Sequence, residues 1–248
     1  MILFLFLTQL IVLSNINNMI KKLVILTGAG ISAESGIETF RDADGLWEGH
    51  DVMEVASPEG FANNPELVLD FYNQRRKQLL AVQPNKAHYN LSELENEFDV
   101  EIITQNVDNL HEKAGSTKVT HLHGELLKVR SSVDESLVLD WHKDLFLGDL
   151  CKYNSQLRPH IVWFGEMVPM LDKAIEITLK ADILVIIGTS MQVYPAASLI
   201  NYVQQDIPIY FIDPKPSVSE NDFNNLTIIK NIASSGTDTL NELLKSMY

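Results

Sequence analysis

Residues 23–36 read LVILTGAGISAESG, and this stretch predicts the fold more directly than any other part of the sequence. Its first four residues form a continuous apolar run, which is typical of a strand covered on both faces. Gly28 and Gly30 then allow a tight turn, whose N–H groups would approach a pyrophosphate at the start of a helix. The G-x-G-x-x-A pattern is weak by itself, because an ordinary strand-to-helix turn has the same residues.

Further apolar runs, each ending at a turn or polar residue, predict more strands, at residues 100–103, 161–164, 183–187, 207–212 and 226–229. Between them, helical apolar spacing predicts helices at residues 88–97, 171–180, 195–205 and 237–245. Strands that alternate with helices favour an α/β fold with a doubly wound parallel sheet. An ordinary dehydrogenase would continue with a second strand and an acidic residue, but residues 39–47 do not read as a strand.

Composition narrows the class of protein. The 248 residues are 46% apolar and 21% charged, which is ordinary for a globular chain. The net charge of −14 disfavours nucleic-acid binding, although basic protein tails remain suitable partners. The single cysteine, Cys151, cannot form an internal disulfide, so a reducing, cytoplasmic location fits best. We expect a monomer that is not bound to a membrane.

The N-terminus differs from the rest of the chain. Residues 1–13 are apolar, but they are too few to span a bilayer and lack the positive start of a signal peptide. We interpret residues 1–18 as a disordered extension or a mis-called start, and residues 19–248 as the domain. A membrane-surface or export segment and a packed helix are the alternatives. Residues 42–83 and 128–159 interrupt the alternation, and we interpret them as insertions that form a small second module.

Two polar motifs follow predicted strands. Residues 104–111 read TQNVDNLH, and their amides and carboxylate suit ribose hydroxyls or a carboxamide, unless they only cap the next helix. Residues 121–124 read HLHG, which places His121 and His123 on one face of a strand. An imidazole is a suitable general base at neutral pH, although a lone histidine is more often structural.

Six motifs in order make the sequence resemble the sirtuin family over residues 21–248. They read GAGIS from Gly28, FR from Phe40, TQNVD from Thr104, HLHG from His121, VWFGE from Val162 and GTS from Gly188. Sirtuins are NAD-dependent protein deacylases, so the resemblance implies a Rossmann-like domain with a small module. NAD and an acyl-lysine peptide would enter the cleft between these two parts.

The resemblance also implies roles for individual residues. His123 would be the general base, and Val162, Phe164 and Gly165 would bind the peptide backbone by strand addition, whereas a buried core strand is the other interpretation. Asp213 stands where the family usually has asparagine. The implied cofactor-binding residues are Gly28, Ala29, Gly30, Ser32, Phe40, Arg41, Trp47, Gln105, Asn106, Asp108, Gly188, Thr189, Ser190, Asp213 and Gly236.

Tyr72 and Arg75 bear on the acyl group. They are three residues apart, so a helix would place them on one face. The sirtuin subgroup that removes acidic acyl groups has Tyr-x-x-Arg here, and a guanidinium pairs well with the carboxylate of succinyl- or malonyl-lysine. The alternative is a solvated basic face, because Arg76 and Lys77 follow directly.

The sequence departs from the resemblance at the zinc site. Most sirtuins hold structural zinc with two Cys-x-x-Cys pairs, but residues 128–132 read KVRSS and residues 150–154 read LCKYN. Only Cys151 is present, so we predict no zinc and a module held by packing, through Trp141, Phe146 and Leu150. Two other functions stay open, namely mono-ADP-ribosyl transfer and a non-catalytic module that binds NAD, ADP-ribose or acyl-lysine.

Overall fold

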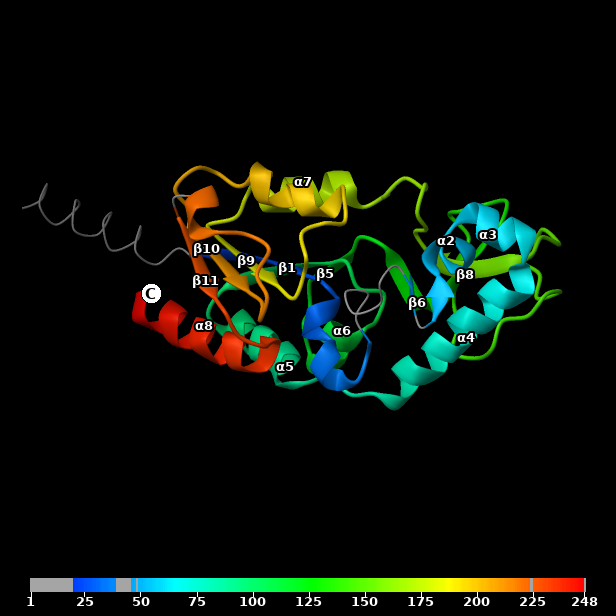
Figure 1. Ribbon diagram of the computed structural model, residues 1–248, viewed down its shortest axis with the longest axis horizontal. Coiled ribbons are helices and arrows are strands. Elements are labelled where there is room, and N and C mark those ends of the chain that lie inside the picture. The colour runs from blue at the N-terminus through cyan, green and yellow to red at the C-terminus, as the bar shows by residue number, and fades with distance from the viewer. Residues whose placement is uncertain (1–19, 39–45, 48, 224, 248) are drawn as a thin grey trace, which may run out of the picture.

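The computed structural model describes residues 20–38, 46–47, 49–223 and 225–247. Its larger part is a six-stranded parallel sheet with the order β11-β10-β9-β1-β4-β5 (Figure 1). The strands are β1 (Lys22–Thr27), β4 (Asp99–Thr104), β5 (Val119–His121), β9 (Ile183–Ile187), β10 (Ile209–Ile212) and β11 (Leu226–Ile229). The chain runs outward from β1 to β5 and then returns to β9 on the other side, so the strand order reverses between β1 and β9.

Both faces of this sheet are covered, as the continuous apolar runs predict. Leu23 and Ile25 of β1 pack on one side with α5 (Lys86–Glu93) and α8 (Ala233–Met247). The alternating residues Val24 and Leu26 pack on the other side with α7 (Leu171–Thr178) and the 3-10 segment η5 (Ala196–Tyr202). In Figure 1, α7 therefore lies above the sheet, while α5 and α8 lie below it. The doubly wound α/β architecture is confirmed.

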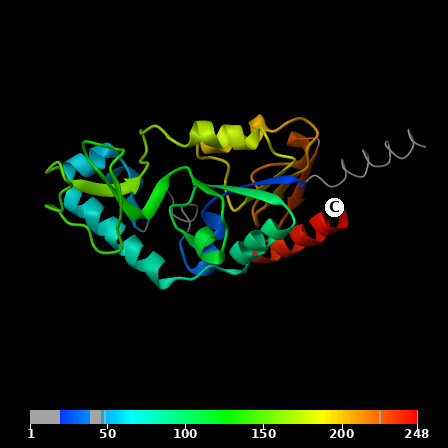
Figure 2. The same cartoon turned by 180° about the vertical axis from the view of Figure 1, so that it is seen from behind.

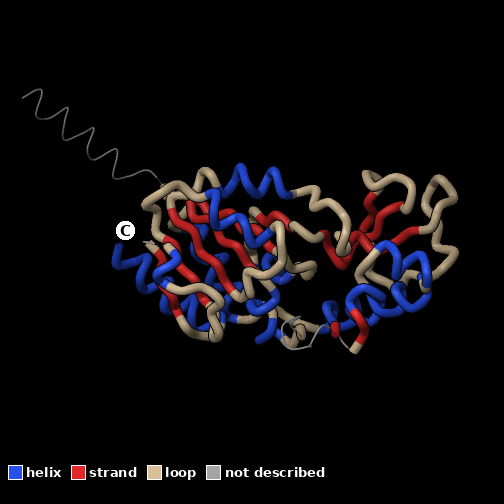
Figure 3. Tube along the Cα trace, turned by 45° about the horizontal axis from the view of Figure 1, so that its top comes forward, coloured by secondary structure: helices blue, strands red, loops and turns tan. Residues whose placement is uncertain are grey.

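A smaller module lies beside the sheet domain, as Figure 2 shows from behind. It contains a three-stranded antiparallel sheet with the order β7-β6-β8, formed by β6 (Gly124–Ser131), β7 (Val138–Asp140) and β8 (Leu157–Ile161). Helices from an earlier part of the chain pack against it, namely α2 (Val52–Val55), α3 (Pro58–Asn63) and α4 (Pro65–Ala81). A short hairpin, β2 (Leu46–Trp47) with β3 (His50–Asp51), precedes them. Figure 3 shows the separate extended segments that join the two lobes.

Three local predictions are wrong. The run 161–164 is not a strand of the parallel sheet, because β8 ends at Ile161 and pairs with β6 in the small module. The glycine turn opens no α-helix but two 3-10 turns, η1 (Ala29–Ile31) and η2 (Ala33–Ser35). Residues 195–205 also form a 3-10 segment instead of an α-helix. The remaining described elements are α6 (Leu110–Ala114), η4 (Leu94–Asn96) and η6 (Glu220–Asp222).

Candidate active site

The polar motifs meet where the strand order reverses, at the carboxyl edge of the large sheet. The loop after β1 contacts the loop after β9 so closely that a β-carbon on Gly30 would lie 2.6 Å from the Cα of Gly188. Gly28 N donates to Ile187 O at 3.0 Å, and Gly30 N donates to Gly188 O at 2.8 Å. These two N–H groups are therefore paired within the protein, and the role of the turn toward a pyrophosphate stays a prediction. The glycines allow two strand-end loops to pack together at the place where open α/β sheets bind ligands.

Three of the predicted residues form a buried polar cluster beside this contact. Ser32 Oγ donates to Asp108 Oδ2 at 2.9 Å and accepts from Asn106 Nδ2 at 3.1 Å. The Asn106 amide also donates to Gly28 O at 3.2 Å. Burial raises the pKa of Asp108, while hydrogen bonds from Leu110 N and Ser32 act in the opposite direction. The cluster connects the loops after β1 and β4, so both motifs contribute to one site.

Gln105 extends the cluster toward β9. Its Nε2 donates to Thr189 Oγ1 at 3.1 Å, and its N donates to Thr27 O at 2.9 Å. Gly188 has a φ of +63°, a left-handed conformation that favours glycine. The structure thus brings Gln105, Gly188 and Thr189 together, with Ser190 directly following. Asp213 follows β10, where its Oδ1 accepts from Lys215 N at 2.8 Å.

His121, the last residue of β5, and His123, two residues later, both contact the loop that follows β4, but their surroundings shift their pKa values in opposite directions. His123 Nδ1 donates to the carbonyl of Gln105 at 2.9 Å, which leaves Nε2 as the lone-pair nitrogen of a neutral imidazole. Burial lowers the pKa of His123, although the bond to Gln105 opposes that change. The lowered pKa favours the neutral form of His123, which is the form that a general base requires.

His121 is held by its two ring nitrogens. Nδ1 donates to Asn106 O at 3.0 Å, and Nε2 lies 2.8 Å from Glu112 Oε1. Burial alone would lower the pKa of His121, but the Glu112 carboxylate outweighs it and raises the pKa. Both ring nitrogens of His121 therefore have partners, and its Nδ1 holds the Asn106 backbone.

Residues 162–166 lie between His123 and the small module. Val162 N donates to His123 O at 2.9 Å, and Phe164 N donates to Ala56 O at 2.9 Å. Val162 is half-buried, Trp163 is buried and Phe164 is exposed, so alternate side chains face opposite ways. Both interpretations of this segment agree with that pattern, because Trp163 belongs to the core and its neighbours do not.

Comparisons with known proteins agree with this geometry. The family model described as "Sir2 family" matches residues 28–195. The chain belongs to the Sir2 family. It is 68% identical over 195 residues to an NAD-dependent protein deacylase of Helicobacter pylori, covering 79% of this chain and 85% of that protein. It is 52% identical over 230 residues to an NAD-dependent protein deacylase of Bacteroides thetaiotaomicron, covering 90% of this chain and 98% of the relative.

Solved structures extend the likeness to the whole Sir2 fold. A Sir2 homologue in complex with NAD superposes with a TM-score of 0.81 at 40% identity, covering 92% of this chain and 91% of that one. A Sir2 protein bound to acetylated peptide superposes with a TM-score of 0.74 at 29% identity, covering 91% and 94%. The Rossmann-like sheet with a second small sheet module is therefore the Sir2 arrangement.

Tyr72 and Arg75 lie on α4, within the small module of this Sir2 protein. Both side chains are buried, with 1% of Tyr72 and 7% of Arg75 exposed. The alternative of a solvated basic face is thus wrong for Arg75, and also for Arg76, whose Nε donates to Leu126 O at 3.2 Å. Burial raises the pKa of Tyr72, so its phenol stays protonated. The structure brings the two proposed acyl-binding residues together in one buried environment.

The positions of the family's zinc cysteines do not fit the metal. Cys151 Sγ lies 3.3 Å from Ser131 Oγ, to which it donates, and Tyr153 N approaches the sulfur at 3.4 Å. Among the described residues, no three His, Cys, Asp or Glu side chains lie together in a way that would hold a metal ion. The expected packing is found in part: Trp141 packs against this core, but Phe146 and Leu150 are exposed, while Leu145 and Leu157 are buried.

An ion-pair network that the sequence did not predict connects this module to residues 162–166. Glu166 accepts from Arg130 Nη2 at 3.1 Å and from Arg158 Nη1 at 2.7 Å, and it also accepts from Trp163 N at 2.8 Å. Burial would raise the pKa of Glu166, but the hydrogen bonds from Arg158 and Trp163 N outweigh it and lower the pKa. No spacing rule could have found it, because its members lie on β6, on β8 and after β8.

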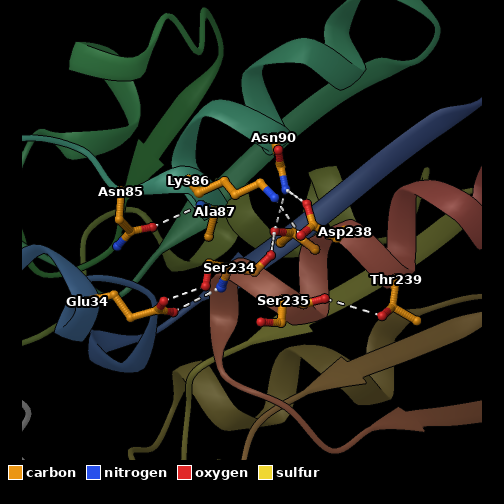
Figure 4. A network of polar contacts seen from close by, with 10 residues as sticks. Glu34, Asn85, Lys86, Ala87, Asn90, Ser234, Ser235, Asp238 and Thr239 are labelled. Carbon is orange, nitrogen blue, oxygen red and sulfur yellow. Dashed lines mark hydrogen bonds and ion pairs between the residues drawn. The ribbon is translucent and has the colours of Figure 1, made fainter.

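Gly236, one of the residues implied to bind the cofactor, does not lie in a loop. It lies inside α8, where its N donates to Ile232 O at 2.8 Å and a β-carbon would overlap Ile212. Figure 4 shows how α8 is held: Ser234 N donates to Glu34 Oε1 at 2.9 Å, and Asp238 pairs with Lys86 at 2.6 Å. Glu34 lies in η2, so the glycine loop and the C-terminal helix are tied together.

For three predicted cofactor residues, the structure does not describe the side chain. Phe40 and Arg41 lie outside the described residues, and Trp47 is described only as part of β2. Among the described residues, none of the helices has the length and apolar character that crossing a bilayer requires.

Proposed function

We propose that this chain removes acyl groups from protein lysines in an NAD-dependent reaction that gives nicotinamide and O-acyl-ADP-ribose. Membership of the Sir2 family supports the reaction class, and relatives named NAD-dependent protein deacylases support the activity. The observation that carries the proposal is the neutral imidazole of His123, fixed by Gln105 where the loops after β1, β4 and β9 meet.

The polar residues at this edge have the donors and acceptors that a dinucleotide requires. Ser32, Asn106 and Asp108 offer hydroxyl, amide and carboxylate groups suited to ribose hydroxyls and a carboxamide. Ala29, Gly188 and Ser190 lie on the adjoining loops, and Asp213 lies after β10. NAD, when bound, would supply the ADP-ribose that takes up the acyl group, with nicotinamide as the leaving group. His123 Nε2, as the general base, would accept the proton of a ribose hydroxyl.

The peptide would bind along residues 162–166, beside the base. Val162 N donates to His123 O, which holds this segment beside the base, so a peptide lying along the segment would place its acyl-lysine next to the imidazole. Phe164 and Gly165 continue the segment past the end of α2, where Phe164 N donates to Ala56 O. A Sir2 protein bound to acetylated peptide supports a peptide partner of this kind.

We further propose that acidic acyl groups, succinyl and malonyl, are preferred to acetyl. Tyr72 and Arg75 supply a phenol and a guanidinium from one face of α4, and a buried guanidinium favours a carboxylate strongly. Acetyl-lysine lacks that charge, so it would gain nothing from Arg75.

The test of the reaction is a mass-spectrometric assay on acetyl- and succinyl-lysine peptides, with and without NAD. We expect NAD-dependent loss of the acyl mass, and a fall of about 10²-fold or more in turnover for His123→Ala, as general-base loss predicts. Near-normal turnover in that variant would refute the assigned base. A gain of ADP-ribose mass on protein would indicate transfer instead, and binding without turnover would indicate a module.

The test of acyl preference compares Arg75→Met with Lys77→Met. Lys77 lies on the same helix, is exposed and pairs with Asp144 at 2.9 Å, so its substitution controls for loss of positive charge. We expect Arg75→Met to raise the KM for succinyl peptides by about tenfold or more, because a charge-assisted hydrogen bond contributes about 1.5–3 kcal/mol. Equal effects on both peptides would rule out the carboxylate contact.

A further inference from the structure

One histidine of the motif after β4, His111, has no part in the proposed reaction. It lies on α6 and is completely buried, so its contacts are with other residues of the protein. Its Nε2 lies 3.0 Å from the Oγ1 of Thr27, which is the last residue of β1. His111 thus contacts the strand end that leads directly into the glycine turn.

A chain of hydrogen bonds leads from this contact to the active-site loop. Thr27 Oγ1 donates to Thr104 Oγ1 at 2.8 Å, where the carboxyl ends of β1 and β4 pair. Thr104 Oγ1 also accepts from Asn106 N at 3.0 Å. Both threonines are completely buried. The chain therefore ends on the backbone of the residue whose amide side chain donates to Ser32 and to Gly28 O.

The directions of these hydrogen bonds assign the proton of the His111 ring. Burial holds the pKa of His111 well below its ordinary value, which favours a neutral ring with one proton. Thr27 has a single hydroxyl hydrogen, which it donates to Thr104, so the proton of His111 lies on Nε2 and is donated to Thr27. His111 Nδ1 is buried and has no hydrogen-bond partner among the described residues. The ring therefore acts on the strand ends through Nε2.

The loop at the end of this chain is held at its backbone. Asn106 N donates to Thr104 Oγ1, and Asn106 O accepts from His121 Nδ1 at 3.0 Å. The preceding Gln105 O accepts from His123 Nδ1 at 2.9 Å, so the same loop also orients the proposed base. A shift of this loop would therefore move the polar groups that are suited to NAD.

We propose that His111 is a positioning residue for cofactor binding, which acts through Thr27 and Thr104 to fix the Asn106 backbone in the loop that binds NAD. This inference rests on the proposed use of NAD at this site. It gives a role to a residue of the TQNVDNLH motif that reaches the cofactor only through other residues.

The test compares two amides that replace different atoms of the imidazole. The amide nitrogen of His111→Gln reaches the position of Nε2, whereas that of His111→Asn reaches only the position of Nδ1. Both variants lose the buried ring, so both should lower Tm. We expect the Kd for NAD, measured by calorimetry, to rise about 5- to 10-fold for His111→Asn and to stay within about twofold for His111→Gln.

Two outcomes of this comparison would overturn the inference. Equal Kd values for the two variants would mean that the imidazole only fills space in the core. A larger rise for His111→Gln than for His111→Asn would mean that Nδ1, and not Nε2, is the nitrogen that matters.

Thr27→Val tests the same chain from its middle, and it serves if the amide variants do not fold. Valine keeps the branched shape and removes the hydroxyl that joins His111 to Thr104, so we expect the Kd for NAD to rise about 5- to 10-fold. Thr178→Val is the matched control, because Thr178 is buried on α7 and its Oγ1 donates to Ala174 O at 2.8 Å. The control should lower Tm without changing the Kd. A wild-type Kd for Thr27→Val, or an equal rise in both valine variants, would refute the role of the chain.

A double-mutant cycle shows whether His111 acts through Thr27. We expect His111→Asn to cause no further rise in the Kd for NAD when it is added to Thr27→Val, because the first change has already broken the chain. Rises that multiply in the double variant would overturn the proposed path.

The inference and the proposed function fail in different ways, because NAD binding does not require turnover. If the wild type binds NAD but removes no acyl group, the proposed function is wrong, while the Kd values still test His111. If the wild type deacylates but His111→Asn and His111→Gln have equal Kd values, the proposed function stands and only the role of His111 is refuted. If the wild type binds no NAD, both are wrong.

Discussion

In the sheet domain, the buried polar side chains near the active site are mostly neutral and bind one another or the backbone, as Ser32 and Asn106 do. In the small module, the buried polar side chains near residues 162–166 are charged, and Glu166 lies between two arginines. Neutral networks lose little by desolvation, whereas buried ions are costly unless each is paired. The contrast suggests that the two regions respond to different perturbations.

The largest effect should follow the loss of Glu166. Glu166→Ala would leave Arg130 and Arg158 without their carboxylate in a largely buried place, which typically costs about 3–5 kcal/mol. For a chain of this size that corresponds to a fall in Tm of about 10 °C, measured by calorimetry.

Glu125→Ala is the matched control for this prediction. Glu125 pairs with Lys128 at 2.8 Å in the same module, but both side chains are about one-third exposed, so the pair should contribute under about 1 kcal/mol. If the two alanine variants had the same Tm, the buried network would not be what stabilises the small module.

The sequence predicted the sheet domain better than the module, for a physical reason. Strands β1, β4, β9 and β11 are apolar runs because both sheet faces are buried, and these strands are confirmed. The run 161–164 looks the same in the sequence, yet only Ile161 and Trp163 are buried, so its alternation is hidden by apolar neighbours. The sequence therefore predicts a strand of the parallel sheet at 161–164, where the chain in fact leaves β8 of the small module.

In the candidate site too, residues in local motifs could be predicted from the sequence, whereas contacts between distant segments could not. Motif order located Ser32, Asn106, Asp108 and His123, whose contacts are within or between strand-end loops. The role of Gly236 depends on its packing against Ile212, and the Glu166 network depends on pairings across the small module, so neither follows from local spacing. The predicted residue roles toward NAD remain predictions.

One group in the sheet domain, His88, should make the stability of the protein depend on pH. His88 is completely buried on α5, and burial lowers its pKa to about 4, with Glu112 opposing the change. The unfolded chain, with a pKa near 6.5, therefore binds more protons as the pH falls. Above about pH 6.5, His88 therefore does not change the free energy of unfolding. As the pH falls from 6.5 to 4, the free energy of unfolding falls by up to about 3 kcal/mol.

His88→Gln tests this effect while preserving the local helix start. Asn85 caps α5 and its N donates to His88 Nδ1 at 3.4 Å, a position that glutamine also fills in capping boxes. We expect the variant to lose less Tm than the wild type between pH 7 and 4.5. His142→Gln, at an exposed position of the small module, is the control for loss of a histidine elsewhere in the chain. Parallel curves for His88→Gln and the wild type would contradict the prediction.

A smaller effect, confined to cofactor use, should follow Ser32→Ala. This change removes one hydroxyl that donates to Asp108 and accepts from Asn106, leaving two buried polar groups short of a partner. We expect the KM for NAD to rise about tenfold, since such a loss costs about 1–3 kcal/mol. Ser57→Ala is the control: Ser57 Oγ accepts from Gly60 N at 2.9 Å at the start of α3, so its loss should lower Tm without changing the KM for NAD. Steady-state kinetics with both variants would decide between cofactor binding and stability.

The smallest effect should be that of metal removal, which tests how the small module is held. Cys151 Sγ donates a hydrogen bond to Ser131 Oγ, and among the described residues no group of His, Cys, Asp or Glu side chains could hold a metal ion. We therefore expect a chelator to leave Tm and turnover unchanged, and elemental analysis to find well under one zinc per chain. A structural zinc would behave differently, because its binding free energy is part of the folding free energy and chelation would unfold the module. If a chelator lowered Tm as much as Glu166→Ala does, the ion pairs would be secondary, and ligands outside the described residues would have to complete a metal site.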